Sequence, residues 1–149
     1  MSNVFGVMLQ RTVRLIEKSS IPLARNDAAP QLVIGSVGFV GQITGTVYLC
    51  FTEEFSQSSA CHILGMSPAE LEMEGPTVVK DVVGELTNMT VGGFKNILAD
   101  LGYPCKLTLP VIMRGHHISV SACKSAYREI YHFESEQHRI SADIQMMPE

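Results

Sequence analysis

Basic clusters and long apolar runs are both missing from this sequence of 149 residues. Its 11 lysines and arginines are scattered and its net charge is −4, whereas a nucleic-acid-binding surface concentrates positive charge. No apolar run approaches the ~20 residues that a membrane-spanning helix needs. The N-terminus has no basic stretch before its apolar residues, as a signal peptide would have. We therefore expect a cytoplasmic protein that binds neither nucleic acid nor membrane.

Residue patterns of metal sites and of common hydrolases are also missing. The four cysteines stand alone, without a Cys-x-x-Cys pair, which favours reduced thiols over disulfides or a zinc site. The five histidines include the adjacent pair His116 and His117, and none has a carboxylate or cysteine at a recognised metal spacing. The sequence has no Gly-x-Ser-x-Gly elbow and no Gly-x-x-x-x-Gly-Lys-Ser/Thr loop. We expect no metal or other cofactor to be held by this chain.

What the sequence does contain is enough apolar material for a folded domain. Apolar residues make up 46% of the chain and charged residues 17%, a balance typical of globular proteins rather than disordered ones. A chain of this length buries roughly 68–70% of its unfolded surface. No linker or low-complexity stretch interrupts it. We interpret residues 1–149 as a single domain.

Periodicity and capping residues predict an α+β fold. Helices are expected from Ser2 to about Pro22, from Thr52 to Gly65, for a short stretch after Ser67, and from Pro76 to about Leu101. Strands are expected at 32–34, 43–51, Lys106–Met113, Ile118–Lys124, Ala126–Glu134 and His138–Met146. This order, with runs of strands separated by a run of helices, is typical of an antiparallel sheet with long helices packed on one face.

The longest predicted helix carries a stripe of polar residues. Asp81, Glu85, Asn88 and Gly92 lie within about 60° of one another when projected at 100° per residue. The other side of the helix is apolar, and we assign its core face to Val79, Val82, Val83, Leu86, Met89, Ile97 and Leu101. On spacing alone, the stripe is also what any amphipathic helix presents to solvent.

Two features of this helix favour a functional surface over an ordinary solvated face. Asparagine is a poor residue inside a helix, where alanine, lysine or glutamate would be more stable. The helix also contains Gly84, Gly92 and Gly93, each of which costs up to ~1 kcal/mol relative to alanine. A glycine at position 92 would allow another surface to approach the stripe closely.

The pattern Asp-x₃-Glu-x₂-Asn-x₃-Gly, filled by Asp81, Glu85, Asn88 and Gly92, resembles the signature of the CheC/CheX-type chemotaxis phosphatases. The segments at 41–49 and 107–115 also resemble the corresponding segments of that family. The likeness runs from about Ile34 to Gly115. Members with two sites carry a second Glu-x₂-Asn copy near the N-terminus, but here Glu17 is followed at that distance by Ser20. A single site per chain is similar to the CheX branch.

The resemblance implies a phosphatase that hydrolyses the phosphoaspartate of a CheY-like receiver domain. It implies that Asn88 positions a water molecule, which a carboxamide can do because it both donates and accepts hydrogen bonds. It implies that Glu85 docks the protein by pairing with a lysine of the receiver. Asp81 and Gly92 would lie at the edge of the surface that binds the partner. The Mg²⁺ ion that such receivers need would belong to the receiver and not to this chain.

Two further expectations concern the partners of the protein. A strand-rich C-terminal third suggests an open sheet edge, which a second copy would cover, so we expect a homodimer. The alternative to an enzyme is a module of the same fold that binds a receiver without turnover. The sequence does not identify the receiver or show whether its pathway is flagellar.

Overall fold

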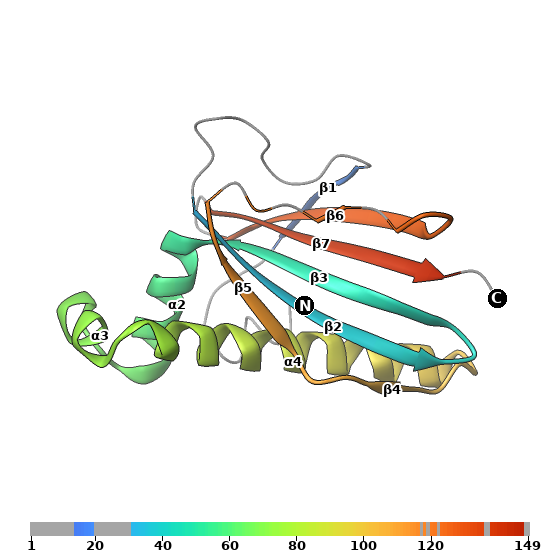
Figure 1. Cartoon of the computed structure of the whole chain (residues 1–149), viewed down its shortest axis with the longest axis horizontal. Helices are drawn as coiled ribbons and strands as arrows, with labels where there is room; N and C mark the ends of the chain where they lie inside the picture. The colour runs from blue at the N-terminus through green and yellow to red at the C-terminus, as the bar shows by residue number, and fades with distance from the viewer. Residues whose placement is uncertain are drawn as a thin grey trace.

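A computed structural model describes residues 14–19, 31–116, 118, 120–121, 123–135 and 138–147 of the chain (Figure 1). Within these residues, seven strands form one antiparallel sheet in the order β1-β6-β7-β3-β2-β4, with β5 also paired to β2. Three helices, α2 to α4, lie on one face of the sheet, and the longest of them, α4, runs beneath β2 and β3 in the view of Figure 1. The expected α+β class, with an antiparallel sheet and helices on one face, is confirmed.

The bounds of the elements follow the capping residues closely. The strands are β1 (Arg14–Ser19), β2 (Leu32–Gly41), β3 (Thr44–Thr52), β4 (Cys105–Leu107), β5 (Val111–Gly115), β6 (Tyr127–Ser135) and β7 (His138–Met147). The helices are α2 (Glu53–Leu64), α3 (Pro68–Glu74) and α4 (Pro76–Asp100). Thr52 and Ser67 accept hydrogen bonds from backbone amides in the first turns of α2 and α3, as N-caps do. Gly65 ends α2 in the left-handed conformation, with φ 64°.

The main core lies between the sheet and the helices. Alternate side chains of β2 and β3 point toward the helices, and the largest buried ones, Phe39 and Phe51, pack with Phe55 of α2 and Leu86 of α4. Strand alternation places the other side chains on the opposite face of the sheet. This packing fixes α4 against β2, and it therefore determines which face of α4 points toward solvent.

The opposite face of the sheet has a buried polar cluster beneath the segment that precedes β6. Arg128 forms a salt bridge of 2.6 Å with Asp143, and its guanidinium also donates to the carbonyl of Val120. The Gln145 side chain accepts from the amide of Cys123 and donates to the carbonyl of Ser121. The prediction of a strand at Ile118–Lys124 is wrong at the described positions in that range, because this backbone bonds to side chains of the sheet and not to a neighbouring strand.

Residues 14–19, predicted to belong to an N-terminal helix, form strand β1 instead. This strand pairs antiparallel with β6, from Arg14 opposite Glu134 to Ser19 opposite Ile130. The helical spacing of apolar residues in this short segment is overridden by the ladder of hydrogen bonds that a sheet edge offers. The remainder of the predicted N-terminal helix lies outside the described residues.

The predicted strand Lys106–Met113 is two strands, β4 and β5, separated by residues 108–110. Both pair with β2, with Leu107 opposite Phe39 and Val111 opposite Ser36. Pro110 lacks an amide hydrogen, so it cannot donate to a continuous ladder. The period-two pattern predicted both flanking strands but not the interruption between them.

The apolar face of α4 is only partly the one predicted. Val79, Val82, Val83 and Leu86 are buried as expected, but Met89, Ile97 and Leu101 are exposed. Val91 and Leu98 are buried instead. A projection onto a straight cylinder assumes one fixed contact line, whereas the sheet below α4 is twisted and the buried sector shifts around the helix along its length.

Candidate functional site

The polar stripe of α4 faces solvent along its length. Asp81, Glu85 and Asn88 are exposed, and Gly92 is half-buried. The packing on the other side of the helix explains this orientation, because Val82, Val83 and Leu86 are pressed against the core. The structure thus brings the predicted site residues onto one accessible face.

A close contact between α4 and β2 sets the distance between the helix and the sheet at the level of the stripe. Thr87, which lies between Glu85 and Asn88 in the sequence, is fully buried, and its hydroxyl donates a 2.7 Å hydrogen bond to the carbonyl of Val83. Gly35 of β2 lies directly beneath it, where a Cβ atom would overlap the Thr87 side chain. Glycine at position 35 therefore allows the helix to approach the strand at the level of the site.

The other glycines of α4 have separate roles. Gly84 is buried and faces β5, where an added Cβ would lie 3.7 Å from the Ile112 side chain. An added Cβ at Gly92 or Gly93 would meet nothing within 4 Å. The space beside Gly92 is therefore open.

An open depression of about 400 Å³ lies beside the stripe. Glu85, Asn88 and Asp81 contribute to its lining together with Lys80, Gly84, Pro110 and Ile112. Lys80, Pro110 and Ile112 are not predicted site residues, although Pro110 and Ile112 belong to the segment 107–115, which resembles the corresponding segment of the phosphatase family. The depression is lined by two carboxylates, one carboxamide and one lysine, which suits recognition of polar groups on a protein partner.

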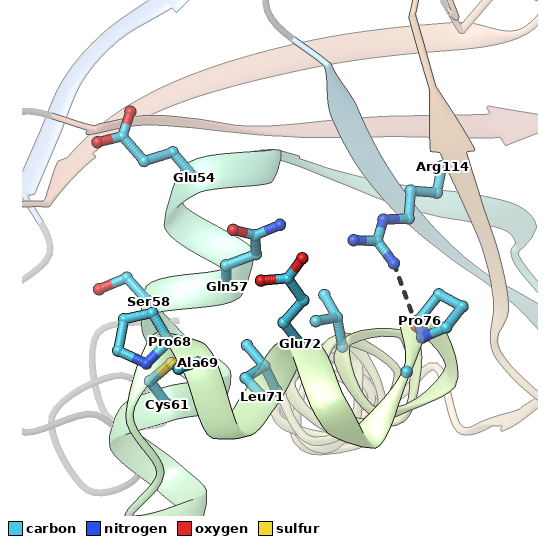
Figure 2. Close-up of a pocket in the computed structure, with 12 residues that line it drawn as sticks. Glu54, Gln57, Ser58, Cys61, Pro68, Ala69, Leu71, Glu72, Pro76 and Arg114 are labelled. Atoms are coloured by element: carbon cyan, nitrogen blue, oxygen red, sulfur yellow. Dashed lines mark hydrogen bonds between the residues drawn. The ribbon is translucent and has the colours of Figure 1, made fainter.

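A larger cavity of about 770 Å³ lies between α2, α3 and the start of α4 (Figure 2). Arg114 lines it, but its guanidinium forms a salt bridge with Glu53 and donates a 3.1 Å hydrogen bond to the carbonyl of Pro76. Figure 2 shows Glu54 and Glu72 at the same cavity. The positive charge is thus already neutralised, and the arginine ties β5 to the first residues of α2 and α4.

Other reactive groups lie away from the stripe. Burial raises the pKa of the Cys50 thiol to about 11, so it is protonated at neutral pH and is a poor nucleophile. Among the described residues, no three histidine, cysteine, aspartate or glutamate side chains gather where they could hold a metal ion. None of the helices that the structure describes is both long enough and apolar enough to cross a membrane.

Comparisons with known proteins converge on one family. Residues 33–134 match the family model described as chemotaxis phosphatase CheX. Comparison with curated proteins gives no match. Among solved structures, the chemotaxis protein CheX from Vibrio vulnificus is 27% identical with a TM-score of 0.79, covering 97% of this chain and 92% of that chain. A CheC-like superfamily protein from Shewanella is 28% identical with a TM-score of 0.80, covering 99% and 92%.

A third similar structure is the CheX–CheY–BeF₃–Mg²⁺ complex from Borrelia burgdorferi. It is 19% identical with a TM-score of 0.73, and the alignment covers 99% of this chain and 92% of that chain. At this identity the likeness shows a shared fold.

Proposed function

The chain belongs to the CheX family of chemotaxis phosphatases, and we propose that it hydrolyses the phosphoaspartate of a CheY-like receiver domain. The observation that carries the proposal is the exposure of Glu85 and Asn88 on one face of α4, beside an open depression. The Borrelia CheX has been solved bound to CheY with BeF₃ and Mg²⁺, which supports a receiver domain as the partner.

In the proposed mechanism, Asn88 enters the phosphorylation site of the receiver and holds a water molecule in line with phosphorus. The water oxygen bonds to phosphorus while the bond from phosphorus to the aspartyl oxygen breaks, which yields inorganic phosphate and a free carboxylate. An acyl phosphate is already labile, so the phosphatase contributes mainly by positioning. No covalent intermediate forms on this chain.

The remaining stripe residues are assigned to docking. Glu85, one turn before Asn88, pairs with a lysine of the receiver, and Asp81 and Gly92 form the rim against which the receiver rests. This chain supplies no metal in the mechanism, because Mg²⁺ belongs to the receiver.

The test is phosphate release from a phosphorylated receiver domain with and without the purified protein. Faster release in its presence supports the enzyme. Binding of the phosphorylated receiver without faster release would instead identify a scaffold module on the same fold. Neither binding nor release with any receiver from the same cell would contradict both functions.

We predict that Glu85→Ala weakens binding of the phosphorylated receiver by roughly 10- to 100-fold, because a charge-assisted hydrogen bond contributes about 1.5–3 kcal/mol. The stability of the protein should change by less than ~0.5 kcal/mol, since Glu85 is exposed. Titration calorimetry with the receiver measures the affinity. Glu74→Ala, at an exposed glutamate of α3, is the matched control and should bind normally. Wild-type affinity in Glu85→Ala would remove the docking role.

We also propose that the protein is a homodimer in which the sheet edges of two copies meet or exchange strands. In the described part of the chain, β1 ends the sheet at the side away from β4 and β5. Because Pro110 and Ile112 at the β4–β5 side line the proposed site, pairing at β1 would leave both sites open. Sedimentation velocity at micromolar concentration should give twice the chain mass of 16.3 kDa. A monomer mass at that concentration would contradict the dimer.

A further inference from the structure

The connection between β4 and β5 is a β-bulge in the strand pairing. Leu107 lies opposite Phe39 of β2, and Val111 lies opposite Ser36. Between these pairs, two residues of β2 face three residues of the other strand, 108–110. An extra residue on one strand bends it locally and redirects the side chains around the bulge. Such bulges are often found next to active sites.

Hydrogen bonds hold the bulge firmly in place. The amide of Thr108 donates to the carbonyl of Gly38 at 2.9 Å, and the amide of Gly38 donates to the Thr108 hydroxyl at 2.8 Å. Pro110 fixes its own backbone φ angle at the other end. Leu109, between these two restrained residues, is 86% exposed. The bulge therefore presents one leucine side chain to solvent from a fixed backbone.

The bulge lies beside the proposed catalytic stripe. Pro110, the residue after Leu109, lines the same depression as Glu85 and Asn88. Figure 1 shows the connection from β4 to β5 passing alongside α4. On the helix, Met89 is partly exposed next to Asn88. A partner that fills the depression beside Asn88 also contacts Pro110, the residue that follows Leu109 in the bulge.

We propose that Leu109 is an apolar anchor for the receiver domain, contacting an apolar patch next to the phosphorylated aspartate. This inference rests on the proposed function and adds a specificity residue that lies outside the Asp-Glu-Asn-Gly pattern. A single exposed leucine is ordinary on a protein surface. This one differs because its backbone is held rigidly and its neighbour lines the site. Charged groups at the depression orient a partner, whereas a desolvated leucine supplies affinity and lowers the rate of dissociation.

The experiment compares wild type and Leu109→Ser for phosphate release as a function of phosphorylated receiver concentration. Leu109→Ser should raise KM by roughly 10-fold with kcat within about twofold, because an apolar contact that takes no part in the transfer of the phosphoryl group is the same in the ground and transition states. Met73→Ser is the matched control, because Met73 is 88% exposed on α3 and away from the depression. Leu109→Met keeps an apolar side chain and should retain a KM close to wild type.

The outcomes separate this inference from the proposed function. If wild type releases no phosphate from any receiver, the proposed function fails and the anchor fails with it. If wild type is active and Leu109→Ser has an unchanged KM, or loses kcat alone, the anchor is wrong while the phosphatase stands. Light scattering of Leu109→Ser should give the wild-type mass. A change of oligomeric state would assign Leu109 to a contact between copies and overturn the proposal.

Discussion

Asn88→Ala is expected to fold normally, and its phosphatase rate should fall by about 10²- to 10³-fold. This is the usual effect of removing one positioned hydrogen-bonding group at a reacting centre. Asn88 is exposed, so its truncation leaves no cavity. Alanine is also the better helix former by a few tenths of a kcal/mol, so the melting temperature should hold or rise slightly. Phosphate release from a phosphorylated receiver measures the rate, with a melting curve taken on the same sample.

The chain provides a matched control for this variant on the same helix. Asn96 is also an exposed asparagine of α4, about two turns farther along, and it lies outside the depression. Asn96→Ala should therefore keep the wild-type rate while gaining the same helix propensity. Near-normal release by a well-folded Asn88→Ala would rule out water positioning by this amide.

Asn88→Asp tests the role of the amide without removing its bulk. The substitution replaces a hydrogen-bond donor with a negative charge that would face phosphate oxygens, so we expect a loss of rate comparable to that of Asn88→Ala. A variant that retained activity would show that an acceptor alone is sufficient at this position. The positioning role would then have to be revised to general base catalysis.

The sequence was sufficient to predict the orientation of the stripe because that information is local. Asp81, Glu85 and Asn88 follow the helical period, and the apolar residues opposite them in the same turns, such as Val82 and Leu86, are buried as predicted. The predicted apolar face is wrong only farther along the helix, at Met89, Ile97 and Leu101. The ends of α2 and α3 were predictable for a similar reason, since Thr52, Gly65 and Ser67 form their hydrogen bonds or adopt their φ angles within a few residues. These features need no knowledge of distant parts of the chain.

Features that depend on distant partners could not be predicted. Residues 14–19 become a strand because β6, more than a hundred residues later, offers an edge to pair with. The bulge at 108–110 follows from its register against β2; Pro110 is a local sign of an interruption, but it does not give that register. The contributions of Pro110 and Ile112 to the depression depend on distant partners in the same way, because the pairing of β5 with β2 places them there. Lys80 lies on α4 itself, one residue before Asp81, and the helical period alone could have placed it at the site.

The position of the site residues on α4 also depends on a distant part of the chain, because Thr87 of α4 packs against Gly35 of β2. Thr87 separates Glu85 from Asn88 in the sequence and points the opposite way, into the core. A displacement of Thr87 away from β2 would therefore lift and turn the segment that carries both functional side chains. Positioning catalysis is sensitive to such shifts, since a misplacement of about 1 Å can cost ~10²-fold in rate.

Gly35→Ala is accordingly expected to reduce both stability and activity. The added methyl group overlaps the Thr87 side chain, and overpacking of a core typically costs up to ~3 kcal/mol, or roughly 6–12 °C in melting temperature for a protein of this size. Receiver dephosphorylation should fall by at least about tenfold at a temperature where the variant remains folded. Circular dichroism melting and phosphate release measure the two effects.

A second substitution tests whether the contact with Thr87 is the cause. Thr87→Ala removes the two atoms closest to the added methyl group, so Gly35→Ala combined with Thr87→Ala should recover part of the lost stability and activity. Thr87→Ala alone should cost only about 1 kcal/mol, since it loses the hydroxyl bond to Val83 and a little packing. In a double-mutant cycle, the double variant should therefore lose about 1–2 kcal/mol less stability than the sum of the losses of the two single variants. Additive losses would show that the effect of Gly35→Ala does not arise from its contact with Thr87.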